Sequence, residues 1–204
     1  GADNYSYGNA RVACGGMAGG ENVVNVRIIA GKYGGRIIDA PGRSSTHAMG
    51  ERVRNALFNS IGGEVEGVRV LDAFAGSGAV GLEALSRGAS FATFVEKDRI
   101  AAKIIAANCQ LLGADTSSDV IKTTVSNWLE TADPDLYDII FADPPYHDEQ
   151  FSTVKRLFGL LKPNGLMVLS HTGIREVPVQ NEIVVVDNRS YGNAHLTFFR
   201  RRGV

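Results

Sequence analysis

Apolar residues along most of the chain occur in two alternating arrangements. Runs of consecutive apolar residues are typical of strands buried on both faces of a sheet, whereas apolar residues every three or four positions are typical of helices. The strand-like runs cover residues 68–73, 91–95, 120–124, 137–142 and 166–171. The helical segments between them cover residues 78–87, 99–112, 127–131 and 149–161. This alternation predicts an α/β fold with a doubly wound, mostly parallel sheet.

The two ends of the chain follow other patterns. Residues 182–187 and 194–201 flank a polar, glycine-containing stretch, which predicts an antiparallel C-terminal hairpin and brings the sheet to seven strands. Near the other end, two short strands at 25–30 and 35–39 predict a small β-hairpin. Helical spacing over 48–61 then predicts a helix that a pair of glycines ends.

These patterns divide the chain into three parts. We expect residues 1–22, which show no periodicity, to be a disordered N-terminus, with 1–16 an artificial leader and Met17 the natural start. Residues 23–62 form the hairpin and helix, which we interpret as an appendage. Residues 63–204 form the sheet domain.

Composition narrows the class of protein. The 204 residues carry a net charge of −1 and are 44% hydrophobic, as in soluble globular proteins. No apolar run approaches the roughly 18 residues of a membrane span, and no basic segment precedes an apolar stretch at the start. Cys14 and Cys109 form neither a disulfide framework nor a zinc spacing. We therefore expect a cytoplasmic protein that holds no metal.

The charge is distributed unevenly along the chain. Residues 23–59 hold six basic and two acidic side chains, whereas 60–204 hold 14 basic and 18 acidic ones. A basic appendage on an acidic body indicates a polyanionic partner, although a solvated basic hairpin would show the same charges. The candidate phosphate contacts are Arg27, Lys32, Arg36, Arg43, Arg52 and Arg54. Because Arg52 and Arg54 are two positions apart on a predicted helix, we expect only one of them to reach such a partner.

A glycine-rich turn follows the first strand of the predicted sheet. Gly76, Gly78 and Gly81 fit the G-x-G-x-x-G pattern, and Glu96 lies twenty residues after Gly76, which taken alone fits an NAD site. Asp72, however, ends the strand before the turn, where a carboxylate would repel a pyrophosphate and attract a cation. We therefore favour S-adenosylmethionine (SAM), which has a sulfonium and an amino group but no phosphate. Glu96 would then accept hydrogen bonds from the two ribose hydroxyls.

A second motif, Asp143-Pro144-Pro145-Tyr146, follows the strand at 137–142. An exocyclic amine is a weak nucleophile because its lone pair is delocalised into the ring. The Asp143 carboxylate and the Pro144 carbonyl are suited to accept its two N–H groups, while the prolines keep the turn fixed. Tyr146 offers a face on which a flipped base can stack. The pattern predicts methyl transfer to an amine, driven mainly by alignment.

Four segments in this order resemble the RsmD-type RNA methyltransferases, which methylate N2 of a guanine in 16S ribosomal RNA. They are residues 27–32 (RIIAGK), 51–59 (ERVRNALFN), 72–88 (DAFAGSGAVGLEALSRG) and 143–146 (DPPY). The resemblance covers about residues 26–200 and implies a Rossmann-like class I methyltransferase domain. Where that family often reads Arg-Pro-Thr, this chain has His-Ala-Met-Gly at 47–50.

The resemblance also implies roles for individual residues. The SAM site would be formed by Asp72, Phe74, Ala75, Gly76, Ser77, Gly78, Glu96, Lys97, Val125 and Ser126, with Asp143, Pro144, Pro145 and Tyr146 holding the guanine. The basic residues of the appendage would contact RNA. The implied partner is 16S rRNA within the small ribosomal subunit or its assembly intermediate, and the implied enzyme is a monomer.

Several other functions use similar motifs. Methylation of adenine N6 in DNA or in another RNA would need the same four-residue motif, but 204 residues hold no visible target-recognition domain. Methylation of a protein glutamine amide usually involves a motif that begins with Asn, after a helical domain. An RNA-binding assembly factor that keeps SAM as a structural ligand, and an NAD oxidoreductase, are the remaining alternatives.

Overall fold

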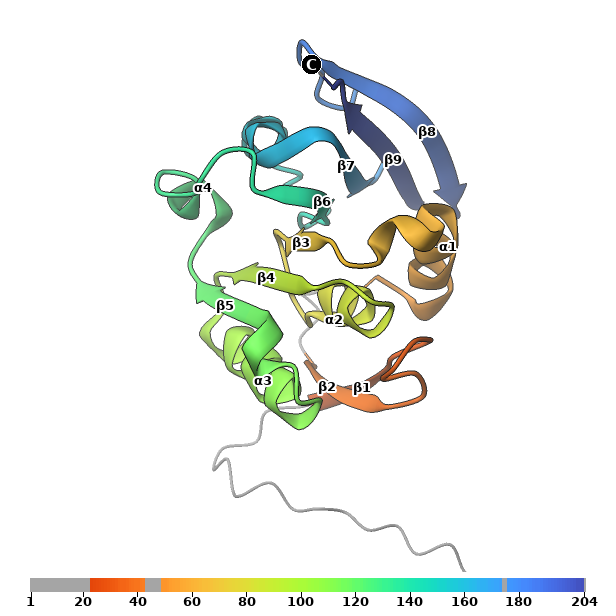
Figure 1. Ribbon diagram of the computed structural model, residues 1–204, viewed down its shortest axis with the longest axis vertical. Coiled ribbons are helices and arrows are strands. Elements are labelled where there is room, and N and C mark those ends of the chain that lie inside the picture. Colours follow the sequence, from red (N-terminus) through yellow and green to blue (C-terminus); the bar gives the residue numbers. More distant parts are fainter. Residues whose placement is uncertain (1–22, 43–48, 174–175, 204) are drawn as a thin grey trace, which may run out of the picture.

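The computed structural model describes residues 23–42, 49–173 and 176–203. Its main element is a seven-stranded sheet with the strand order β5-β4-β3-β6-β7-β9-β8 (Figure 1). The strands are β3 (Arg69–Asp72), β4 (Phe91–Glu96), β5 (Ser118–Lys122), β6 (Tyr137–Ala142), β7 (Leu161–His171), β8 (Ile183–Tyr191) and β9 (Ala194–Arg201). Strands β3 to β7 run parallel, and β9 is antiparallel to both of its neighbours. The predicted fold class and the C-terminal hairpin are confirmed.

Five helices accompany the described strands. They are α1 (Glu51–Ile61), α2 (Ala79–Ser86), α3 (Arg99–Leu111), α4 (Val125–Trp128) and α5 (Phe151–Leu157), with short 3₁₀ turns at Gly62–Val65, Asp115–Ser117 and Phe158–Leu160. Alternate strand residues supply two apolar clusters, as is typical of sheets buried on both faces. Helices α1, α2 and α3 pack in one cluster, and α4 and α5 pack in the other.

The N-terminal hairpin packs directly on the sheet domain. Its strands β1 (Val23–Arg27) and β2 (Ile37–Pro41) are antiparallel and lie beside α2 and α3 (Figure 1). The connection between them places Ile28 and Tyr33 in the same apolar cluster as α2. The Asn108 side chain of α3 also bonds the backbone N–H and carbonyl of Asp39, at 3.2 and 2.8 Å. An RNA-binding role for residues 23–62 stays a prediction.

Many element boundaries differ from the predictions by one to three residues, and the differences are larger in three places. Strand β7 begins at Leu161, five residues earlier than predicted. Its pairing with β6 shifts register, which allows the strand to continue through Pro163 and through Asn164, whose φ is 66°. The helix expected over 149–161 is correspondingly reduced to α5. Strand β8 extends to Tyr191, since polar residues that look like a turn pair with β9 instead. The leader, Met17 and Arg43 lie outside the described residues.

Candidate active site

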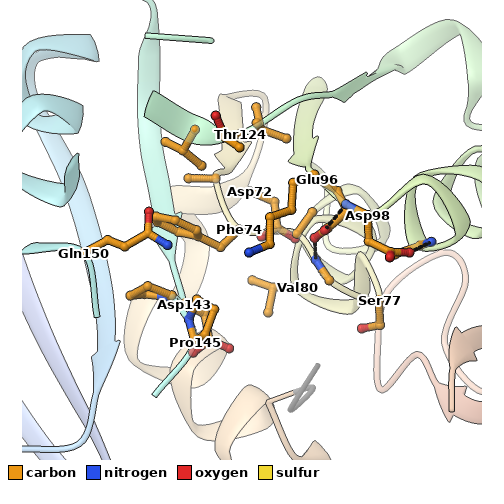
Figure 2. Close-up of a pocket in the computed structure, with 18 of the residues that line it drawn as sticks. Asp72, Phe74, Ser77, Val80, Glu96, Asp98, Thr124, Asp143, Pro145 and Gln150 are labelled. Carbon is orange, nitrogen blue, oxygen red and sulfur yellow. Dashed lines mark hydrogen bonds between the residues drawn. The ribbon is translucent and has the colours of Figure 1, made fainter. Parts of the chain in front are cut away.

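A cavity of about 700 Å³ lies beyond the carboxyl ends of β3, β4 and β6 (Figure 2). This is the edge at which parallel α/β sheets bind ligands. The predicted site residues that line it are Asp72, Phe74, Ala75, Gly76, Ser77, Glu96, Lys97, Val125, Ser126, Asp143, Pro144, Pro145 and Tyr146. The fold thus brings the glycine loop, the acid at the end of β4 and the Asp143–Tyr146 segment to one space. The ligand atoms that each residue binds stay a prediction.

Gly78 is the one predicted cofactor residue that the cavity lining leaves out. It has a φ of 75° at the start of α2, a conformation that favours glycine. A Cβ atom at Gly78 would come within 3.0 Å of the Ile105 side chain, and one at Gly81 would come within 2.4 Å of the Phe94 ring. These two glycines therefore allow α2 to pack closely on β4 and α3, and a place for Gly78 in the cofactor site stays a prediction.

Glu96, the last residue of β4, fastens the loop to the sheet. Its two carboxylate oxygens accept the backbone N–H groups of Gly76 at 2.7 Å and Asp98 at 2.8 Å (Figure 2). Burial raises the pKa of Glu96 above its ordinary value, although these two hydrogen bonds oppose the rise. Each carboxylate oxygen has a second lone pair, so Glu96 can also accept from ligand hydroxyls at the cavity.

Asp72 is more deeply placed than a simple ligand contact requires. Its side chain is 2% exposed and accepts the Gly81 N–H at 3.0 Å, which couples the end of β3 to α2. Burial raises the pKa of Asp72 to about 8, with further contributions from Asp143 and Glu96 and against the Gly81 hydrogen bond. Asp72, Glu96 and Asp143 are three of the five carboxyl groups that line the cavity, and in their ionised forms they attract a cationic ligand and repel a pyrophosphate.

The segment after β6 presents the second set of polar groups. Asp143 is half-buried and Pro144 is buried, whereas Tyr146 is 37% exposed at the cavity. Burial raises the pKa of Asp143 to about 7, and a hydrogen bond from Ser170 lowers it. A carboxyl group with this pKa can accept hydrogen bonds in its ionised form and can also take up a proton near neutral pH.

Comparisons with known proteins identify the family. A family model described as "Conserved hypothetical protein 95", the RsmD family, matches residues 26–200. The chain belongs to the RsmD family. It is 33% identical over 161 residues to "Ribosomal RNA small subunit methyltransferase D" of Escherichia coli K12, covering 79% of each chain. The protein of the same name from Haemophilus influenzae is 35% identical over 150 residues, covering 70% of this chain and 76% of that one.

Solved structures show the same fold. The hypothetical protein TTHA0928 of Thermus thermophilus has a TM-score of 0.72 at 32% identity, covering 88% of this chain and 99% of that one. The structure of SMU.776 complexed with SAH has a TM-score of 0.67, covering 92% of this chain and 58% of that one. At 16% identity, the second likeness concerns the fold alone. Since its relatives are named rRNA methyltransferases, this RsmD-family chain is a methyltransferase.

The cavity also contains residues that the sequence patterns did not reveal. Pro41 and Met49 line it from the N-terminal part of the chain. Gln150 lines it from the residue before α5 (Figure 2). Pro41 ends β2 and Met49 precedes α1, so both belong to the N-terminal segment, while Gln150 has a positive φ of 46°. Asp98, which also lines the cavity, could have been predicted from the sequence, since it lies two residues after Glu96, just beyond the end of the same strand.

The basic residues of this RsmD-family chain have different environments. Arg27, Lys32, Arg36 and Arg52 are exposed. Arg54 is 1% exposed, and its guanidinium donates to the carbonyl oxygens of Arg27 at 2.5 Å and Met49 at 3.4 Å. The prediction that Arg54 contacts RNA is therefore wrong, while the prediction that only one of Arg52 and Arg54 faces outward agrees with this burial.

Two of the exposed cations already have partners within the protein. Arg27 forms an ion pair with Glu51, and Arg36 donates to the Leu111 carbonyl at 3.0 Å. In the described part of the chain, no helix is long and apolar enough to cross a membrane. The same residues contain no group of three or more His, Cys, Asp or Glu placed to hold a metal ion.

Proposed function

We propose that this protein transfers the methyl group of SAM to the exocyclic N2 amine of a guanine in 16S rRNA of the small ribosomal subunit. The observation that carries this proposal is that the Asp143–Tyr146 segment faces the same cavity as the glycine loop and Glu96. The names of the relatives support the substrate, since both are small-subunit rRNA methyltransferases. We also propose that the enzyme acts in the cytoplasm as a monomer on the small subunit or its assembly intermediate.

The residues present fit SAM. Five carboxyl groups line the cavity, from the end of β3, from β4 and the turn after it, and from the loop after β6. SAM carries its positive charge on the sulfonium and the amino group. Asp72 and Glu96 would hold the amino and ribose ends, as the resemblance implies. When bound, SAM supplies an electrophilic methyl group attached to sulfur.

The target amine is prepared by the loop after β6. The Asp143 carboxylate and the Pro144 carbonyl would accept the two N2–H groups, which turns the nitrogen lone pair toward the methyl carbon. Tyr146 would stack on the guanine ring. As the N–C bond forms and the S–C bond breaks, the nitrogen would lose one proton to Asp143, whose pKa is about 7.

A labelled-methyl assay tests this function. SAM with a labelled methyl group is incubated with small-subunit particles that lack their own modifications, beside free 16S RNA, tRNA, DNA and a protein extract. The product nucleoside is identified by mass, and N2-methylguanosine in the particle lane is the expected result. Label confined to the DNA or protein lane would overturn the substrate, and calorimetry that shows NAD binding without SAM binding would overturn the cofactor.

A single variant tests the mechanism. We expect Asp143→Ala to lower the transfer rate by about 100-fold or more, because both the acceptor of the N2–H group and the proton acceptor are lost. SAM affinity, measured by calorimetry, should remain within about threefold. Asp133→Ala removes an exposed carboxylate before β6, at the opposite end of the strand, and serves as the control. Transfer at the wild-type rate by Asp143→Ala would remove Asp143 from the mechanism.

A further inference from the structure

Ser170 lies behind the Asp143–Tyr146 segment and contacts both of its ends. It is the second-last residue of β7 and is 3% exposed. Its hydroxyl oxygen is 3.4 Å from the Tyr146 hydroxyl oxygen, and its side chain also interacts with the Asp143 carboxyl group and lowers the pKa of that group. One buried hydroxyl on a central strand therefore joins the carboxylate and the aromatic ring of the candidate motif.

The donors and acceptors give this pair of bonds a direction. An ionised carboxylate can only accept hydrogen bonds, so the Ser170 hydroxyl must donate its one proton to Asp143. The Ser170 oxygen then accepts from Tyr146, whose phenol O–H is a donor. The order is Tyr146 O–H to Ser170, and Ser170 O–H to Asp143. The ionised form of Asp143 thus sets the direction of the whole chain and holds the phenol in place.

We propose that Ser170 is a positioning residue for methyl transfer, whose hydroxyl keeps Asp143 in its ionised, accepting form and orients the Tyr146 ring for stacking. This inference rests on the proposed function for its consequence and on the observed contacts for its geometry. A second contact holds the same loop to β7, because the buried Glu149 carboxylate accepts the Thr172 N–H and hydroxyl, both at 2.7 Å. This contact does not involve Ser170, so we expect the loop to keep its place when the Ser170 hydroxyl is removed.

Several other charged groups lie near Asp143 and affect its titration. Those that line the cavity are Asp72 from β3, Glu96 from β4, Lys97 and Asp98 just after β4, and His147 and Asp148 from the same loop, with Glu149 beside Tyr146. Burial raises the pKa of Asp143 to about 7, and Ser170 is the group that opposes this rise. Loss of the Ser170 hydroxyl therefore raises the pKa of Asp143 further.

Two measurements on Ser170→Ala test the proposal. The first follows the side-chain carboxyl ¹³C resonance of Asp143, assigned by its absence in Asp143→Asn, as the pH is changed in the ligand-free protein. The second follows single-turnover methyl transfer to small-subunit particles over the same pH range. We expect the midpoint of both to move up by about one pH unit, because a hydrogen bond to a charged group is worth about that much.

The shape of the rate profile separates positioning from structure. At pH values below the wild-type midpoint, the rate of Ser170→Ala should be about tenfold lower than that of wild type. At pH values above the midpoint of the variant, its rate should be within about threefold of wild type. Ser170→Thr keeps the hydroxyl and should restore the wild-type midpoint. Thr197→Val removes another buried hydroxyl, one that bonds His171 at 2.8 Å and Asn188 at 2.8 Å on the neighbouring strand, and should leave the midpoint unchanged.

An unchanged carboxyl midpoint in Ser170→Ala would overturn the proposal, even if the rate fell at every pH. The same is true if Thr197→Val moves the midpoint as far as Ser170→Ala does. Failure of the proposed function would look different, since the wild-type protein would then transfer no methyl group to any RNA. The resonance measurement would still report on the hydrogen bond in that case.

Discussion

Replacing Glu83 by alanine tests what binds the N-terminal hairpin to the sheet domain. Glu83 lies on α2, is 0% exposed, and accepts the backbone N–H groups of Ile29 at 2.9 Å and Ala30 at 3.1 Å. It also accepts Arg87 Nε at 2.9 Å and lies 3.7 Å from Arg54 Nε. Arg54 Nε has no hydrogen-bond partner, so this carboxylate is its main compensation.

The structure sets the expected loss of stability. Removing one member of a buried ion pair costs about 3–5 kcal/mol, because the remaining charge is left buried. The two hairpin N–H groups also lose their acceptor, at about 1–3 kcal/mol each when they stay buried. The hairpin can move outward and reach water, so these costs do not add fully. We expect Glu83→Ala to lower the free energy of unfolding by about 3–5 kcal/mol and the melting temperature by about 6–20 °C.

Urea and thermal unfolding followed by circular dichroism measure this loss. Glu130→Ala is the matched control, since Glu130 pairs with Arg156 at 2.7 Å with both side chains exposed, and its loss should cost less than about 1 kcal/mol. Hydrogen exchange of the Ile29 and Ala30 amides should speed up in Glu83→Ala and not in the control. Equal stability of the two variants would refute the view that a buried carboxylate holds the hairpin.

Two further predictions concern the cavity and the basic surface. The pKa of Asp72, about 8 in the folded protein, lies above its ordinary value of 3.8, so wild-type stability should fall as the pH rises through that range. Asp72→Asn should therefore be more stable than wild type by roughly 2–5 kcal/mol near pH 9, with a much smaller difference near pH 4. Urea unfolding at the two pH values measures this difference. An equal difference at both would contradict a raised pKa of Asp72. Arg52→Ala should weaken binding to small-subunit particles and lower the salt slope of log Kd by about one, by anisotropy titrations at several salt concentrations, with stability unchanged. A slope equal to that of wild type would remove Arg52 from the interface.

The sheet and the place of the site could be predicted from the sequence because both follow from local patterns. Continuous apolar runs mark strands such as β3 and β6, since these are buried on both faces. Parallel strands also end at one edge, so the residues that follow them meet there. The convergence of Asp72, Glu96 and Asp143 on the cavity can therefore be predicted without knowing where the helices pack.

Long-range packing decides what the patterns could not show. Helical spacing places Arg52 and Arg54 on different faces of α1, but only the position of α2 makes Arg54 the buried one. Met49 lines the cavity because the hairpin and α1 dock beside it. The early start of β7 depends on a register shift against β6, which is a property of the pair of strands and not of either one alone.

Helix α2 connects the cavity with the N-terminal hairpin. Its residues 79–86 are all buried, as is typical of a helix that packs on every side. The first turn lines the cavity through Ala79 and Val80, and the N–H of Gly81 binds Asp72. The last turn holds the hairpin through Glu83 and through Ser86, whose hydroxyl accepts the Tyr33 N–H at 2.9 Å and donates to the Ala30 carbonyl at 2.5 Å. Glu83 and Ser86 thus hold the hairpin on the same helix whose first turn lines the cavity. If the exposed basic residues of the hairpin bind RNA, as we propose, this helix would keep them at a constant position relative to the cavity, which methylation of one base within a bound RNA requires.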